Sequence, residues 1–296
     1  MSETRVAVIG LGAMGRPMAA RLLPAFPVTA FDLDPLRRDE LGAEGAGTAA
    51  SPAGAAEGAD VVLLAVRDQQ QVEDALFGPD GAVEMLAPGS VVLLTSTVGP
   101  DAARAVADRL AEAGIGLVDA PVSGGPARAG SGDLLIVVSG APESTAAARA
   151  VLDRLASTLT DVSEKPGDAQ GLKAINQLLA GVHIAAAAEA VALAREMGLD
   201  LETVIGSLTQ GAAGSFMLGD RGPRMLDAYR DGAEVRSRLD IFVKDMGIVT
   251  EVARDNHVPV SLAAAAQQLY LLGERAGLGA DDDSSVVTLL SPREAG

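Results

Sequence analysis

The feature that most constrains the fold is a glycine pattern near the start of the chain. The run Gly10, Leu11, Gly12, Ala13, Met14 and Gly15 has the form Gly-x-Gly-x-x-Gly. It follows an apolar stretch, Arg5–Ile9, and opens a predicted helix. In this context the first glycine allows a tight turn, the second lets the backbone approach a pyrophosphate, and the third lets helix pack on strand. The pattern therefore predicts a strand–turn–helix unit that binds a dinucleotide.

An acidic residue stands where such a unit would bind the ribose. Asp32 closes the next predicted strand, and Asp34 follows two residues later. Two carboxylates there disfavour a 2′-phosphate, so the sequence favours NAD over NADP. Arg37 and Arg38 lie close enough to keep NADP as the alternative. A glycine-rich structural turn followed by an unrelated Asp is the other interpretation of the pattern.

The first half of the chain alternates apolar runs with Ala-rich helical segments such as Ala102–Ala113. Continuous runs of Val, Leu and Ile are typical of parallel strands that are buried on both faces. The alternation predicts a doubly wound α/β sheet of the Rossmann type. The candidate strands are Arg5–Ile9, Val28–Asp32, Asp60–Val66, Ser90–Thr95, Leu117–Ala120 and Leu134–Ser139.

The second half has a different pattern, which is almost entirely helical. After the polar turn at 163–167, one long helix is expected over Ala169–Met197, followed by helices at Leu239–Asp255 and Leu262–Gly273. We therefore predict a Rossmann domain, residues 1–163, joined by a long interdomain helix to an all-α C-terminal domain, residues 164–296. The apolar stretch Leu178–Ala194 is interpreted as a buried helix rather than a membrane span.

Charge and composition exclude several classes of protein. Lys and Arg total 23 against 40 Asp and Glu, a net charge of −17, which disfavours nucleic acid and membrane partners. The chain has no Cys and only two His, so disulfides, thiolate–zinc sites and cysteine nucleophiles are excluded, and no metal is expected. No signal peptide is visible at the N-terminus, and we expect a cytoplasmic protein.

Hydride transfer needs a group that exchanges a proton with the substrate oxygen, and the sequence offers few. Neither Tyr229 nor Tyr270 has a Lys four residues later, as short-chain dehydrogenases require. His183 lies within an Ala-rich helix, where a packed core residue is the simpler interpretation. Among the three lysines, Lys173 stands out, since burial beside a cationic nicotinamide would lower its pKa. From spacing alone, a solvated lysine remains the more economical reading.

Two further groups of residues are candidates for binding a substrate. Asn176 and Gln177 lie three and four residues after Lys173, on the same face of the predicted helix. Ser123, Gly124 and Gly125 follow an apolar strand, and their successive N–H groups can form an anion-binding nest. Such a nest suits a carboxylate, although an ordinary Gly-Pro loop is the alternative.

Together these motifs resemble the β-hydroxyacid dehydrogenases, the family of 3-hydroxyisobutyrate dehydrogenase, tartronate semialdehyde reductase and, more distantly, 6-phosphogluconate dehydrogenase. The similarity covers nearly the whole chain. In order, the matching segments are Gly10–Met18, Ser96–Pro100, Asp119–Gly125, Gly171–Gln177 and the pair Lys244-Asp245. The resemblance implies that Thr97 lies by the nicotinamide, that Lys173 is the proton shuttle, that Asn176 contacts the substrate, and that Lys244 approaches the cofactor.

The resemblance also implies a reversible oxidation of a small hydroxy acid, with Ser123, Gly124 and Gly125 holding its carboxylate, in a homodimer or homotetramer. Two departures stand out. Val66-Arg67 replaces a Leu-Pro pair, so any cofactor contact there is expected through the backbone, and Gln177 replaces a second Asn. The run Asn176–Ala190 looks like the threonate dehydrogenase branch. An imine reductase on the same fold and a catalytically silent cofactor-binding regulator remain the alternatives.

Overall fold

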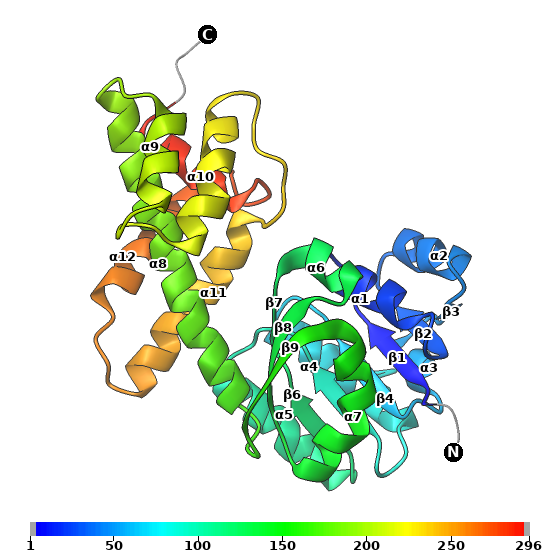
Figure 1. Ribbon diagram of the computed structural model, residues 1–296. Helices are drawn as coiled ribbons and strands as arrows, with labels where there is room; N and C mark the ends of the chain where they lie inside the picture. The colour runs from blue at the N-terminus through cyan, green and yellow to red at the C-terminus, as the bar shows by residue number, and fades with distance from the viewer. Residues whose placement is uncertain (1–3, 293–296) are drawn as a thin grey trace. The chain divides into compact units, whose positions relative to one another are not determined.

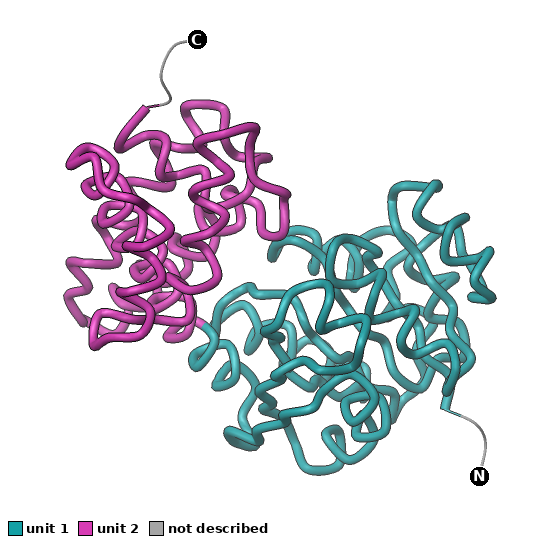
Figure 2. The backbone as a smooth tube through the Cα atoms, turned by 45° about the horizontal axis from the view of Figure 1, so that its top comes forward, with its two compact units in different colours: residues 1–173 teal, residues 174–296 magenta. Residues whose placement is uncertain are grey.

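The computed structural model describes residues 4–292, which form two compact units that divide between Lys173 and Ala174 (Figure 2). The predicted domain boundary at residue 163 falls at the end of the last strand, ten residues earlier. The order of elements is a Rossmann-like sheet with its helices, followed by a helical unit. The predicted fold class is therefore confirmed.

A mainly parallel sheet forms the first unit (Figure 1). Its strand order is β3-β2-β1-β4-β5-β6-β8-β7, with β9 paired to β8. The order reverses between β1 and β4, and ligands of such sheets bind at the carboxyl ends of the strands at this switch point. The strands are β1 (Val6–Ile9), β2 (Val28–Phe31), β3 (Gly47–Thr48), β4 (Val61–Leu64), β5 (Val91–Leu94), β6 (Gly116–Asp119), β7 (Val122–Ser123), β8 (Leu134–Ser139) and β9 (Ala156–Ser163).

Helices bury both faces of the sheet, which explains why its central strands are apolar throughout. Along β1, Val6 and Val8 join one core cluster, whereas Ala7 and Ile9 join the other. The first cluster is completed by α1 (Gly15–Leu22), α2 (Pro35–Ala43), α6 (Gly125–Ser131) and α7 (Pro142–Leu155). The second is completed by α3 (Pro52–Ala56), α4 (Gln69–Phe77), η1 (Ala82–Met85) and α5 (Pro100–Glu112).

All six strands predicted from apolar runs are present, but the prediction missed the shorter and more polar ones. β8 runs antiparallel to β6 and to β7, so that edge of the sheet is mixed. β9 pairs in parallel with β8, yet its residues are largely exposed and include Ser, Thr and Asp. An exposed strand of this kind carries no apolar run, because little of it enters the core.

The second unit is helical and begins with the larger part of α8 (Asp168–Glu196). Its core gathers Ile184 and Val191 from α8 with Phe242, Met246 and Tyr270. The remaining elements are α9 (Leu201–Thr209), α10 (Phe216–Tyr229), α11 (Leu239–Asp255), α12 (Ser261–Arg275), η2 (Asp283–Val286) and α13 (Val287–Leu290). The three long helices predicted in this half match α8, α11 and α12 to within two residues at each end.

Helix α8 is long and apolar enough to cross a membrane by length and composition, but 56% of its most apolar window is buried. One helix that passes this test is weak evidence for a membrane span, because core helices pass it too. The inward face of α8 packs against α10, α11 and α12. It is therefore a core helix, as predicted.

Candidate active site

The glycine turn shows which of its glycines the protein itself needs. A Cβ on Gly10, whose φ is +95°, would lie 2.5 Å from the Ala65 carbonyl oxygen on the neighbouring strand's loop. A Cβ on Gly15 would lie 1.9 Å from the Gly10 oxygen. A Cβ on Gly12 would meet nothing within 4 Å. The fold therefore accounts for two of the glycines, whereas the open space at Gly12 is what a backbone-hugging pyrophosphate requires.

Helix α1 begins at this turn with its positive end uncapped by a side chain. Its N-cap residue, Met14, makes no capping hydrogen bond, whereas Asp34, Ser51 and Asp68 cap α2, α3 and α4. Free N–H groups and the helix dipole favour an anion at such an end. The residues present thus fit the phosphates of a dinucleotide.

Asp32 lies at the end of β2 and is tied to the glycine turn. Its Oδ2 accepts a 2.6 Å hydrogen bond from the Leu11 N–H, and its Oδ1 accepts one of 2.9 Å from the Asp34 N–H. The side chain is 11% exposed, so its carboxylate is held in one orientation. The structure therefore places the predicted ribose-binding carboxylate against the predicted phosphate-binding turn.

Two arginines surround this carboxylate. Arg37 Nη1 lies 3.6 Å from Asp32 Oδ2 and its Nε lies 3.6 Å from Asp34 Oδ2. Arg38 donates to the Asp32 carbonyl and stacks over the Phe31 ring. Both guanidinium groups are thus engaged with the acidic segment, and the local charge is balanced rather than purely negative.

The loop after β5 carries the Ser-Thr motif and is held from an unpredicted direction. The Gln170 side chain accepts hydrogen bonds from the Val98 and Gly99 N–H groups and donates one to the Ser96 carbonyl. Ser96 Oγ accepts from the Val66 N–H, so the loops after β4 and β5 are joined. Thr97, in the loop after β5, is partly exposed, and Arg67, in the loop after β4, donates its N–H to the Gln71 side chain. Gln170 therefore orders this end of the sheet.

A buried carboxylate anchors Gln170 in turn. Asp119, at the end of β6, accepts from the side chain and the backbone N–H of Gln170, from the Gly167 N–H and from the Ser139 hydroxyl. Burial raises the pKa of Asp119, and these hydrogen bonds, Gln170 first, oppose the rise. Asp119 was expected only as the first residue of the segment Asp119–Gly125 that resembles the family's substrate-binding motif, and no role was expected for Gln170. The first turn of α8 also contains Asp168, so no local pattern singled out Gln170.

One turn along α8, Lys173 meets the Ser-Gly-Gly segment. Its Nζ donates to the Val122 carbonyl at 3.0 Å and to Ser123 Oγ at 3.1 Å, and the residue is 9% exposed. These groups are 50 residues apart in sequence. The structure therefore brings together the predicted proton shuttle and the first residue of the predicted carboxylate nest.

The two glycines after Ser123 adopt conformations that other residues avoid. Gly124 has φ +139° and Gly125 has φ +74°, and a Cβ on Gly125 would meet nothing within 4 Å. Gly124 is the N-cap residue of α6 and, because it has no side chain, this helix begins without a side-chain cap. The positive φ values explain why both positions are glycine, and the carboxylate nest expected at Ser123, Gly124 and Gly125 stays a prediction.

In the second unit, the remaining predicted residues form a hydrogen-bonded chain. Asn176 Nδ2 donates to Gln177 Oε1 at 2.9 Å, and Gln177 Nε2 donates to Asp245 Oδ2 at 2.5 Å. Lys244 Nζ lies 2.7 Å from Asp245 Oδ1. Asn176 is exposed, whereas Gln177 and Asp245 are buried. Lys244, which was predicted from a different motif than Asn176 and Gln177, is therefore connected to them through Asp245.

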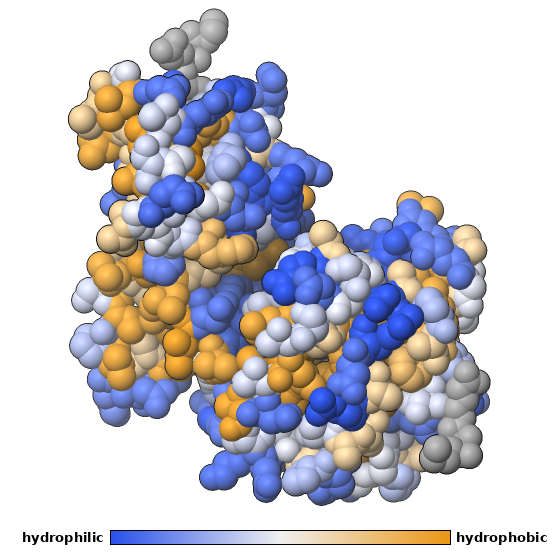
Figure 3. Space-filling model, in the orientation of Figure 1, coloured by the Kyte–Doolittle hydropathy of each residue, from blue (hydrophilic) through white to orange (hydrophobic). Residues whose placement is uncertain are grey.

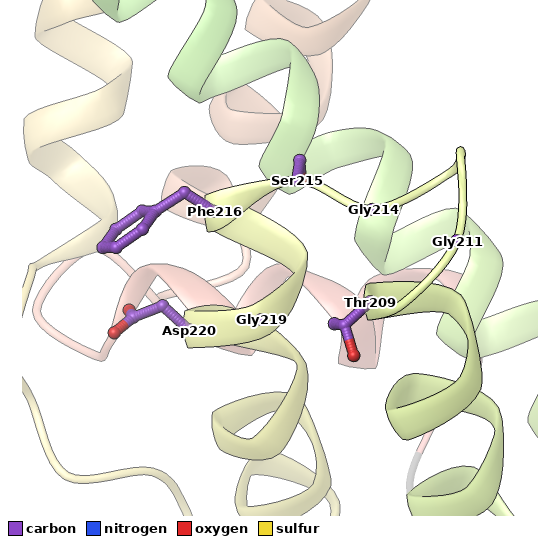
Figure 4. Close-up of a pocket in the computed structure, with 7 residues that line it drawn as sticks. All are labelled: Thr209, Gly211, Gly214, Ser215, Phe216, Gly219 and Asp220. Carbon is purple, nitrogen blue, oxygen red and sulfur yellow. The ribbon is translucent and has the colours of Figure 1, made fainter.

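The second unit also contains an open hollow of about 590 Å³ beside the loop between α9 and α10 (Figure 4). Phe216 and Asp220 point to the same side of α10, and the Phe216 residue is 78% exposed. The polar side chains of the hollow already have partners within the protein: Asp220 pairs with Arg221 and Arg224, and Ser215 caps α10. The hollow offers no uncommitted charged group to a ligand.

Within the part of the chain that the structure describes, no group of three or more His, Asp or Glu side chains could hold a metal ion.

Comparisons with known proteins match both units of the chain. Residues 5–163 match the NAD-binding domain of 6-phosphogluconate dehydrogenase, and residues 167–290 match the NAD-binding domain of NADP-dependent 3-hydroxyisobutyrate dehydrogenase. An L-threonate dehydrogenase of Cupriavidus necator is 42% identical over 285 residues, 96% of this chain and 95% of that protein. A 3-hydroxyisobutyrate dehydrogenase of Pseudomonas aeruginosa is 35% identical and covers 92% of this chain and 93% of its own length.

Among solved structures, 3-hydroxyisobutyrate dehydrogenase from Salmonella typhimurium superimposes with a TM-score of 0.89 at 37% identity, covering 97% of this chain and all of that one. Fold and site thus define an NAD(P)-dependent oxidoreductase built on a Rossmann domain and a helical domain. Within that class, the chain belongs to the β-hydroxyacid dehydrogenase family, as its motifs predicted.

The open space at Gly12 gives a prediction that separates cofactor binding from folding. Gly12→Val should leave the thermal midpoint unchanged but weaken NAD binding roughly tenfold or more, because the new side chain would occupy the path of the pyrophosphate. Titration calorimetry measures the affinity. Gly206→Val, at an equally open glycine in α9, is the matched control. Unchanged NAD affinity in Gly12→Val would show that the dinucleotide does not approach this turn.

Proposed function

We propose that the protein oxidises a small hydroxy acid reversibly with NAD, and that Lys173 is the general acid and base. The observation that supports this most is the contact between a nearly buried Lys173 and Ser123, within 3.1 Å, beside two glycines with positive φ. A proton shuttle and a carboxylate nest then share one small volume of the first unit. That combination suits a substrate whose hydroxyl lies close to its carboxylate.

In the proposed reaction, Ser123 Oγ and the N–H groups of Gly124 and Gly125 bind the substrate carboxylate. The bound nicotinamide supplies the hydride acceptor. Lys173, as the neutral amine, takes the hydroxyl proton as the carbonyl forms, and it returns that proton in the reverse direction. Asn176, three residues along the same helix, contacts the substrate. Val122, whose carbonyl accepts from Nζ, keeps the amine in place between reactions.

The substrate class follows from the carboxylate nest and from the relatives named above. We propose threonate, 3-hydroxyisobutyrate or glycerate-type acids, with threonate first because the relative with 42% identity is an L-threonate dehydrogenase. A panel of these acids, read by NADH absorbance, tests the proposal. The amide of the best acid should lose most of its kcat/KM, since charge-assisted hydrogen bonds to the nest are lost. Equal turnover of acid and amide would mean that the nest is wrongly assigned.

Cofactor choice is proposed to be NAD. The Asp32 carboxylate, fixed by two backbone N–H groups, would repel a 2′-phosphate, and Arg37 and Arg38 are already engaged with the acidic segment. The kcat/KM ratio should favour NAD by at least about tenfold. Asp32→Ala should narrow the ratio, whereas Asp39→Ala, at an exposed carboxylate of α2, should not. Equal use of NADP by the native enzyme contradicts the proposal.

A homodimer or homotetramer in the cytoplasm is proposed for the assembled enzyme. Four apolar side chains form a stripe along the solvent side of α8 and are 40 to 63% exposed: Leu172, Ile175, Leu179 and Leu193. Leu262 and Leu272 of α12 are exposed as well, and Figure 3 shows apolar residues gathered over α8 and α12. Apolar patches of this kind favour association with another subunit.

A further inference from the structure

The second unit contains a chain of polar groups that ends on Asn176. Lys244 pairs with one oxygen of Asp245, and the other oxygen accepts from Gln177 Nε2 at 2.5 Å. Gln177 Oε1 accepts from Asn176 Nδ2 at 2.9 Å. Asp245 is 3% exposed and Gln177 8%, whereas Asn176 is exposed. The chain therefore leads from a buried carboxylate, which is paired with the partly exposed Lys244, to an amide on the surface of α8.

The direction of every hydrogen bond in this chain is dictated by its buried end. A carboxylate has no proton to donate, so Gln177 must turn its NH₂ group toward Asp245. Its carbonyl oxygen then faces Asn176, which must in turn offer its own NH₂ group. Asn176 Oδ1 is left as the atom that can accept a hydrogen bond. Without the charge, either amide could rotate by half a turn and present the opposite polarity.

We infer that Gln177 is a positioning residue, which transmits the charge of Asp245 to the orientation of Asn176. The inference rests on the proposed function of Asn176 as a substrate contact. Both ends of the Gln177 amide are engaged within the chain, and the residue is buried, so it acts on the substrate through its neighbour. Hydrogen-bonded networks of buried polar groups fix side-chain geometry in this way.

A double-mutant cycle tests this role. Gln177→Leu should lower kcat roughly tenfold while the KM for NAD stays unchanged, because Asn176 loses its fixed orientation. In the Asn176→Ala background the same exchange should change kcat by less than about twofold. Gln268→Leu, on the exposed side of α12, is the control and should leave kcat unchanged. Multiplicative losses in the double variant, or an unchanged kcat in Gln177→Leu, would overturn the inference.

A second measurement does not depend on turnover. In protein labelled with ¹⁵N-glutamine, the Gln177 side-chain amide should be protected from solvent exchange and should lose that protection in Asp245→Asn. The native signal can be read even if Gln177→Leu fails to fold. Protection in the native protein without turnover of any hydroxy acid would contradict the proposed function but support the orienting contact of Gln177 with Asp245. Turnover with an unprotected Gln177 amide would contradict the positioning role of Gln177 alone.

Discussion

Lys173→Ala should lower kcat about 10²–10⁴-fold, which is the typical contribution of general acid–base catalysis. The Nζ group of Lys173 lies within hydrogen-bonding distance of Ser123 Oγ, and no described His cluster or metal site offers a substitute. NAD affinity should persist, because the residues expected to bind NAD, the glycine turn and Asp32, follow β1 and β2, whereas Lys173 lies on α8. Stopped-flow measurement of hydride transfer gives the rate, and calorimetry gives the NAD affinity.

Lys173→Arg should recover little of this activity, since a guanidinium keeps its proton at any working pH. In the native enzyme, oxidation should accelerate as the pH rises, because only the neutral amine accepts the hydroxyl proton. Lys165→Ala removes an exposed lysine and is the matched control. A Lys173→Ala variant that binds NAD and turns over near the native rate would contradict the mechanism, and His183 would then be tested.

Gln170→Leu should destabilise the protein by about 3 kcal/mol and also lower kcat. The exchange leaves the buried N–H groups of Val98 and Gly99 without their acceptor, and it removes one donor from Asp119. It also frees the loop that carries Thr97. Urea unfolding measures the free energy of unfolding, with Gln69→Leu, at an exposed position of α4, as the control. A loss as small as that of the control would mean that the network contributes little.

The same exchange should have a defined pH dependence. Burial raises the pKa of Asp119, and the Gln170 side chain lowers it by stabilising the carboxylate. Losing Gln170 therefore raises the pKa of Asp119 further. A carboxyl with a raised folded-state pKa favours folding while protonated, and that contribution is lost as the pH rises through the raised value. The deficit of Gln170→Leu should thus grow from acidic toward neutral pH, and a constant deficit would contradict this account.

The parts of the fold that sequence analysis predicted are those with a local signal. Six buried strands and three long helices have hydrophobic patterns that a short window reveals. β9 lacks such a pattern because most of its side chains face solvent, and β7 is only two residues long. The antiparallel pairing of β8 depends on where the chain returns, which no local pattern encodes.

The site residues also fall into those with a local sequence signal and those that depend on contacts between distant parts of the sequence. The glycine turn and Asp32 are predictable because the motif is short and its geometry is intrinsic to the backbone. The contact between Lys173 and Ser123 joins residues 50 apart, so only the family resemblance pointed to it. The contact between Asp119 and Gln170 was missed because it depends on mutual burial of two residues that are 51 positions apart in the sequence. Gln177 was predicted as a substrate contact, whereas its neighbours in the structure are Asn176 and Asp245.

Lys173 and Asn176 both belong to the continuous helix α8, although Lys173 is assigned to the first compact unit and Asn176 to the second. Each residue of an α-helix turns the chain by about 100° and advances it by about 1.5 Å. A single inserted or deleted residue at positions 174 and 175 would therefore put the two side chains out of phase, even if every other contact survived. Insertions and deletions among members of this family should consequently occur in the loops and not between Lys173 and Asn176, because the spacing of these two residues along the helix must stay constant.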